Sequence, residues 1–334
     1  MLDNRIFDRN TIIKIIIGTI LGVLAVWLAF RGVSIEQLWG VLSGANPWLV
    51  ILGIGAVLLN VATISLRWWV TLLRDWQRSE YNAILGGVYL GQMFNILLPA
   101  RLGELARIYF VSERIDTTKS TLLGSLVLEK VIDLIAFGMA LLLLISALSL
   151  PAWVTDPGNT FIILALIALL AVIALLLFGR RLLRWSTPLL KKLTGSWGDR
   201  ITGILERALT GFDSMRSWKR QLPIWALTFL SLTLSTLTNY VVMESVQIQA
   251  PFTAALFVLI VLQVGSAPPS APGKLGVFHY LAVLALSAFA VDKDLALAYG
   301  VLLYVVALMP KVLIGVGVLI FSRWRLPEMR LKME

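Results

Sequence analysis

Long runs of apolar residues recur from one end of the chain to the other, and they restrict it to a membrane fold. A helix needs about 20 apolar residues to cross the hydrocarbon core of a bilayer. Six runs are long enough, and they cover residues 12–30, 48–66, 121–148, 161–178, 222–246 and 295–320. We therefore expect an all-α polytopic membrane protein with six transmembrane helices.

The composition excludes several other classes of protein. Charged residues make up 14% of the chain, whereas soluble domains carry about 25%, so a soluble enzyme is excluded. Cysteine is absent and histidine occurs once, which removes disulfides and thiolate metal sites. We expect no metal and no cofactor.

Two further apolar regions, 83–111 and 252–290, are interrupted by proline and glycine. Each half is too short to span a bilayer, so we expect two re-entrant helical hairpins with their tips at 99–103 and 268–273. The backbone can break at such depth only where protein or a wet cavity surrounds it.

The two tips share a pattern of proline, a small residue, a basic residue, leucine and glycine. It reads Pro99-Ala100-Arg101-Leu102-Gly103 in the first and Pro272-Gly273-Lys274-Leu275-Gly276 in the second. The order span, span, hairpin, span describes residues 1–150 and again 151–320, with the second copy entering from the opposite side. We expect an inverted-topology repeat, which is typical of secondary transporters that bind substrate near the midplane.

The formal net charge of +10 reflects orientation in the membrane. With a cytoplasmic N-terminus, the inner segments 1–14, 67–82, 107–120, 179–221 and 321–334 hold 23 of the 29 basic residues, and the outer loops hold two. This is a strong positive-inside bias, so we expect no nucleic-acid partner. We expect both termini, 321–334 included, in the cytoplasm of a prokaryotic inner membrane. Segment 179–221 is an amphipathic connector on the inner leaflet, either a simple connector or a surface that recruits lipid or a partner.

Arg101 and Lys274 lie where the returning half-helices begin. A helix N-terminus carries partial positive charge, so an added cation there favours an anion such as phosphate or carboxylate. We expect substrate contact from both residues. The alternative is that Arg101 pairs with Glu104 and only locks the hairpin.

Glu129, Lys130 and Asp133 form a charged cluster in the third span. Lys130 is in reach of Asp133, and one acid should meet Arg101 or Arg107. An ion-pair network or a direct substrate contact would explain the cluster, and an acid without a partner would be a candidate for proton coupling.

His279 is either a neutral hydrogen-bonding group or a proton-coupled switch. Lys311 follows Pro310, which suggests a kink beside a buried charge without defining a role.

The fifth span carries a polar face with Glu244 near its outer end. The face consists of Thr228, Ser231, Ser235, Thr238 and Asn239. It would line a path for a headgroup, with Ser235 and Asn239 as substrate contacts, or serve as close interhelical packing.

These motifs resemble the transmembrane, flippase-like region of the lysylphosphatidylglycerol synthases. The signature positions stand here as Asn95, Pro99, Arg101, Gly103, Glu104 and Arg107, then Glu129, Lys130 and Asp133, then Pro269, Pro272, Gly273 and Gly276. The chain departs from the family pattern at three positions. Lys274 replaces an expected Gly, His279 replaces an acid, and Val305 replaces an Arg.

The resemblance implies translocation of an anionic or modified phospholipid, or of a polyprenyl-phosphate-linked lipid. It adds Asn95, Glu104 and Arg107 to the candidate substrate-binding residues. The aminoacyl-transfer activity of the full-length synthases is not expected, so we expect a transporter rather than an enzyme. Two alternatives stay open. In the first, the chain is a membrane-embedded transferase with Glu244 or Asp292 as base. In the second, it is a non-transporting partner of a lipid synthase.

Overall fold

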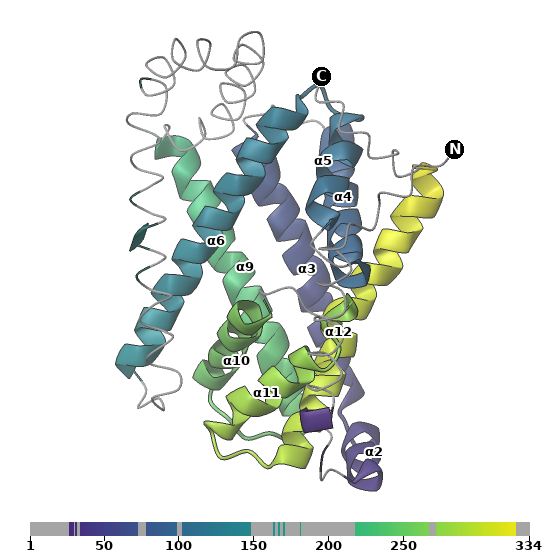
Figure 1. Cartoon of the computed structure of the whole chain (residues 1–334), viewed down its shortest axis with the longest axis vertical. Helices are drawn as coiled ribbons and strands as arrows, with labels where there is room; N and C mark the ends of the chain where they lie inside the picture. The colour runs from purple at the N-terminus through teal and green to yellow at the C-terminus, as the bar shows by residue number, and fades with distance from the viewer. Residues whose placement is uncertain are drawn as a thin grey trace, which may run out of the picture. The chain divides into compact units, whose positions relative to one another are not determined.

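The computed structural model describes residues 27–29, 31, 34–72, 78–98, 102–147, 218–266 and 272–324, with five isolated positions between 163 and 181. Within these ranges the chain forms helices and no β-strand (Figure 1), as the sequence predicts. The α-helices are α2 (Ile35–Ser43), α3 (Pro47–Thr71), α4 (Arg78–Leu97), α5 (Gly103–Ser112), α6 (Lys119–Ala147), α9 (Trp218–Ser245), α10 (Phe252–Gly265), α11 (Val277–Ser287) and α12 (Lys293–Ser322).

Three of the described helices, α3, α9 and α12, are long and apolar enough to cross a membrane. They coincide with the predicted spans 48–66, 222–246 and 295–320. The 29 residues of α6 cover the predicted span 121–148. The predicted spans 12–30 and 161–178, and the connector 179–221, fall almost entirely outside the described residues.

Both predicted interruptions are breaks between helices. The first lies between the end of α4 at Leu97 and the start of α5 at Gly103. The second lies between the end of α10 at Gly265 and the start of α11 at Val277, with a short 3₁₀ turn at Pro272–Lys274. Re-entry into the membrane and the inverted repeat stay predictions.

Local sequence explains where α3 begins. The side-chain oxygen of Asn46 accepts a hydrogen bond from the Trp48 amide at 3.0 Å. This satisfies one of the free N–H groups at a helix start. Pro47 occupies the first helical position, where no N–H is needed.

The described helices belong to two compact units. The first unit comprises residues 1–59, 89–103 and 233–334, and the second comprises 60–88 and 104–232. Within the first unit, α11 packs against α10 and α12, and α2 packs against α12. Within the second unit, Leu128, Ile132 and Ile224 form a buried cluster. Both helix breaks fall in the first unit.

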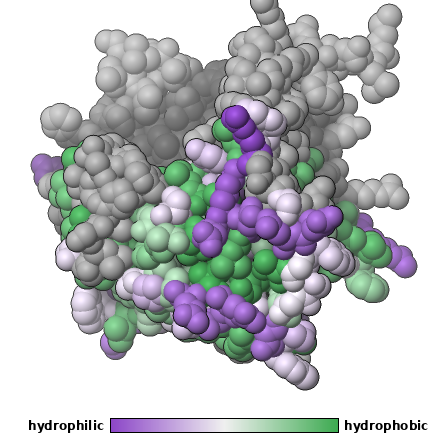
Figure 2. Space-filling model, turned by 90° about the horizontal axis from the view of Figure 1, so that it is seen from below, coloured by the Kyte–Doolittle hydropathy of each residue, from purple (hydrophilic) through white to green (hydrophobic). Residues whose placement is uncertain are grey.

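Large apolar side chains lie exposed on the membrane-length helices. Leu143 on α6, Leu222 on α9, and Leu313 and Phe321 on α12 are all more than 60% exposed. Figure 2 shows hydrophobic residues reaching the surface on one face of the molecule. Soluble proteins rarely expose apolar side chains so widely, so these positions suit contact with lipid.

Candidate functional site

A buried ion pair between Arg107 of α5 and Glu129 of α6 lies at the centre of the second unit. The two guanidinium nitrogens donate to the two carboxylate oxygens at 3.1 and 3.0 Å. The side chains are only 5% and 6% exposed. This bidentate geometry is the strong form of the arginine–carboxylate interaction.

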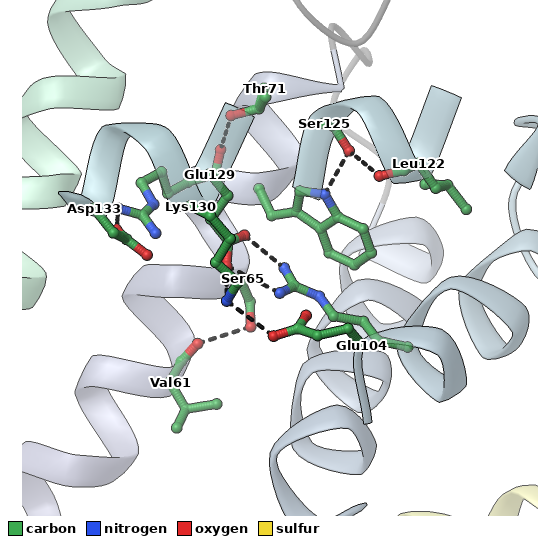
Figure 3. A network of polar contacts seen from close by, with 12 residues as sticks. Val61, Ser65, Thr71, Glu104, Leu122, Ser125, Glu129, Lys130 and Asp133 are labelled. Atoms are coloured by element: carbon green, nitrogen blue, oxygen red, sulfur yellow. Dashed lines mark hydrogen bonds and ion pairs between the residues drawn. The ribbon is translucent and has the colours of Figure 1, made fainter. Parts of the chain in front are cut away.

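Trp68 of α3 supports this pair. The Arg107 guanidinium lies 3.7 Å from the centre of the Trp68 ring, close enough for a cation–π interaction. The indole N–H donates to the Ser125 hydroxyl at 2.9 Å, and that hydroxyl donates to the Leu122 carbonyl at 2.8 Å (Figure 3). The hydrogen bond to Ser125 of α6 therefore fixes the position of the Trp68 ring.

Lys130 connects α5 with α6 beside this pair. Its ammonium nitrogen lies 2.9 Å from a Glu104 carboxylate oxygen and 3.7 Å from a Glu129 oxygen. Glu104 of α5 and Glu129, the residue before Lys130, form these ion pairs with the ammonium group. Asp133, which the sequence places within reach of Lys130, has an ion-pair partner on a third helix.

That partner is Arg67 of α3, the first residue of the predicted inner segment 67–82. Arg67 is 3% exposed, and its guanidinium donates to Asp133 at 2.6 Å and to the Thr228 hydroxyl at 3.1 Å. The side chain joins α3, α6 and α9. α3 continues past residue 66, where the predicted span ends, and Arg67 is buried within this continuation.

Together these residues form a balanced network in the second unit (Figure 3). It pairs Arg67, Arg107 and Lys130 with Glu104, Glu129 and Asp133. Each of these six charged groups has an opposite charge within 3.0 Å. The expected contact between one of the acids and Arg107 is present, and the geometry is that of an interhelical ion-pair network. Substrate contact by these residues stays a prediction.

The first helix break is closed by Asn95. Its side-chain oxygen accepts a hydrogen bond from the Gly103 amide at 2.9 Å. A Cβ atom at Gly103 would overlap the Gly91 carbonyl oxygen, so the close approach of α4 and α5 requires glycine. Arg101 and Pro99 lie outside the described residues. The pairing of Arg101 with Glu104 is therefore untested.

The second helix break depends on left-handed backbone. Gly273 and Gly276 have φ of +73° and +82°, values that glycine adopts without steric cost. Lys274 has φ of +55°, and its ammonium group donates to the Ser266 hydroxyl at 3.1 Å. The Tyr304 hydroxyl of α12 donates to the Gly273 carbonyl at 2.8 Å. Pro272 opens the 3₁₀ turn, and Pro269 lies outside the described residues.

His279 lies in the first turn of α11, three residues after Gly276. It is 7% exposed, and its ring stacks on Tyr304 with centres 5.3 Å apart. Lys311 follows Pro310 within α12, which runs on to Ser322.

The polar face of α9 makes interhelical hydrogen bonds in both units. The Ser231 hydroxyl donates to the Asn60 side chain at 2.7 Å. Asn239 accepts from the Tyr299 hydroxyl at 2.9 Å and donates to the Ser235 carbonyl at 2.8 Å. These contacts agree with the packing interpretation, and a headgroup path stays a prediction. Glu244 is exposed near the end of α9.

Comparison with known proteins identifies the family. The sequence model of the family described as lysylphosphatidylglycerol synthase TM region matches residues 13–315. The chain therefore belongs to this family, as its motifs suggest. The chain is also similar to the glycosyltransferase AglD of Haloferax volcanii, with 28% identity over 131 residues. That match covers 39% of this chain and 20% of the relative. The chain thus matches about a fifth of that protein's length.

Proposed function

We propose that this member of the lysylphosphatidylglycerol synthase transmembrane family is a lipid translocase and not an enzyme. It moves an anionic or modified phospholipid, or a polyprenyl-phosphate-linked lipid, between leaflets. The headgroup phosphate binds near the midplane between Arg101 and Lys274, and the acyl tails stay in the bilayer. The ligand is a membrane lipid, and an enzyme of lipid synthesis is the expected protein partner.

The observation that carries this proposal is the location of the two helix breaks. Both fall within the first compact unit, and the sequence places one cation at each break, Arg101 and Lys274. The helices that follow, α5 and α11, begin directly after these cations. A cation at a helix N-terminus favours a phosphate, so a cation at each of the two breaks suits an anionic headgroup.

Alternating access gives this arrangement a transport cycle. In transporters with inverted repeats, one part of the fold rocks against the other around a fixed site at the broken helices. The headgroup then meets the inner and the outer leaflet in turn. The orientation we propose keeps both termini in the cytoplasm of a prokaryotic inner membrane, in line with 23 of 29 basic residues in inner segments.

Reconstitution in liposomes tests the function directly. A headgroup-labelled anionic lipid is placed in both leaflets, and an impermeant quencher reports movement between them. We expect transport by the wild-type protein and loss of transport after Arg101→Ala with Lys274→Ala. No transport by folded wild-type protein contradicts the function, and unchanged transport by the double variant contradicts the site.

The matched control is Lys293→Ala. Lys293 lies at the start of α12 and donates to the carbonyl groups of Leu28 and Arg31 at 3.2 and 2.6 Å. It is a lysine of the same unit, away from both breaks. We expect transport to persist in this variant.

A membrane-embedded transferase is the second candidate, favoured by the similarity to a protein named as a glycosyltransferase. The reaction needs a carboxylate at the membrane surface as a base. Glu244, exposed near the end of α9, and Asp292, at the start of α12, meet that need. Product formation from purified protein and a polyprenyl-phosphate sugar, lost in Glu244→Gln or Asp292→Asn, would support it over transport.

A further inference from the structure

Three exposed tryptophans mark one end of the first unit. Trp27, Trp39 and Trp48 are 53%, 70% and 77% exposed. Trp39 belongs to α2, which packs against α12 at the lower end of the view in Figure 1, and Trp48 lies in the first turn of α3. Trp27 precedes Leu28, whose carbonyl accepts a hydrogen bond from Lys293 at the start of α12. Tryptophan is enriched where hydrocarbon meets water at a membrane surface, so this end of the unit is a candidate for the membrane boundary.

The exposed apolar face of α3 defines the level of that boundary. Ile51, Leu52 and Leu59 follow Trp48 by three, four and eleven residues, and each is more than half exposed. These spacings place the four side chains on one face of the helix. Because α3 is long and apolar enough to cross a membrane, this face suits contact with lipid. Trp48 then lies at the end of the lipid-facing surface.

α2 has the residue pattern of a helix that lies flat in the membrane interface. Leu38 and Leu42, one turn apart, are half-buried, as expected for the side that packs against α12. Glu36 and Gly40, also one turn apart, are exposed on the opposite side. With about 100° of rotation per residue, Trp39 lies midway between the two sides. Its ring can therefore enter the apolar layer while its N–H stays in contact with water or headgroups.

Hydrogen bonds hold the chain on both sides of α2. Before the helix, the Lys293 ammonium group donates to the carbonyls of Leu28 and Arg31 at 3.2 and 2.6 Å. After the helix, the Asn46 amide donates to the Ser245 carbonyl at the end of α9 at 2.9 Å. α2 is therefore fixed relative to the starts of α3 and α12, and its depth determines theirs.

We infer that α2 is an interfacial anchor whose partner is the boundary between lipid headgroups and acyl chains. Trp39 and Trp48 set the depth of the first unit in the bilayer. α2 contains no Lys or Arg, and Glu36 is its one charged residue, whereas helices recruited by anionic lipids carry basic residues. The attraction therefore comes from burial of the aromatic rings and not from lipid charge. The inference does not depend on lipid transport, and in the orientation proposed above the boundary belongs to the outer leaflet.

Spin labels measure the depth of α2 directly, because the chain has no cysteine and each label needs one substitution. Four full-length variants, Glu36→Cys, Trp39→Cys, Trp48→Cys and Leu59→Cys, are labelled in phosphatidylcholine liposomes. Power saturation with oxygen and with a water-soluble nickel complex then gives the depth of each label. We expect residue 36 in water and residue 59 in hydrocarbon. Residues 39 and 48 should lie at the boundary, within about one helical turn (5.4 Å) of each other in depth.

Lipid charge and a second labelling position provide the controls. Added phosphatidylglycerol or high salt should leave all four depths unchanged. Gly40→Cys keeps both tryptophans, and a Cβ at this position has no atom within 4 Å, so the variant should fold like the wild type. Its label should lie on the water side of the boundary. Thermal unfolding of each variant checks that the protein is folded.

Three results would contradict parts of this account. Nickel access at residue 39 equal to that at residue 36 places α2 in water and overturns the inference. Shielding of residue 39 from both oxygen and nickel means that protein covers it, such as a second copy of the chain, and also overturns the inference. An impermeant thiol reagent added outside cells should react with Gly40→Cys. Reaction from the cytoplasmic side alone contradicts the proposed orientation and leaves the interfacial position of α2 supported.

Discussion

Glu129→Gln is expected to destabilise the protein strongly, because it leaves the Arg107 charge buried without its carboxylate. The pair has two contacts of 3.0 and 3.1 Å, and both side chains are at most 6% exposed. Removing one partner of such a pair costs about 3–5 kcal/mol. The pair of Arg114 and Glu113 is looser at 3.7 Å and 27% and 46% exposed. Glu113→Gln should therefore cost less than about 1 kcal/mol.

Equilibrium unfolding in mixed micelles with increasing dodecyl sulfate, followed by circular dichroism, measures both costs. The single variants Arg107→Met and Glu129→Leu and the double variant that combines them form a double-mutant cycle. Replacing both charges by apolar side chains is often nearly neutral, so the double variant should be more stable than the sum of its single variants predicts. Our account of the network is refuted if Glu129→Gln costs no more than Glu113→Gln, or if the double variant is simply additive.

Four further variants test the packing around the two breaks and the ion-pair network. Trp68→Phe loses an indole hydrogen bond to a serine hydroxyl at 2.9 Å and part of a cation–π contact, so it should cost about 1–2 kcal/mol in the same titration. Gly315→Ala should cost about 1–3 kcal/mol, because its Cβ would lie 2.6 Å from that of Met93. A Cβ added at Gly317 would have no atom within 4 Å, so Gly317→Ala should be neutral or stabilising. An equal loss of stability in the two glycine variants would contradict the close contact at Gly315. Tyr304→Phe should cost about 1 kcal/mol of stability yet abolish most lipid transport, and full transport would show that the tyrosine does not position the break.

Much of the helical layout could be predicted from the sequence, because the bilayer leaves few options. Within the hydrocarbon core every backbone N–H and C=O must form a hydrogen bond inside the protein. Long apolar runs are therefore helical. Proline and glycine then decide where helices stop. The break after α4 was predicted from Pro99 and Gly103, and the break after α10 from three nearby prolines followed by Gly273. At both places the structure interrupts the helix.

The charge pairing could not be predicted from the sequence. The predicted span 48–66 ended before Arg67, and a guanidinium group without partners is costly in the bilayer. The helix nevertheless continues to Thr71, since Asp133 and Thr228 receive the guanidinium hydrogen bonds. These partners lie 66 and 161 residues further along the chain. Hydrophobic periodicity contains no information on such distant neighbours, and the only local signal was the unbroken apolar pattern on either side of Arg67.

The exposure of each ion pair indicates which part of the network can rearrange. The pair of Arg107 and Glu129 is deeply buried, so separating it leaves two charges in apolar surroundings. Lys130 is 49% exposed and lies 2.9 Å from Glu104 and 3.7 Å from Glu129. Its ion pairs are therefore worth less than the buried pair of Arg107 and Glu129, whose separation would leave two charges without partners.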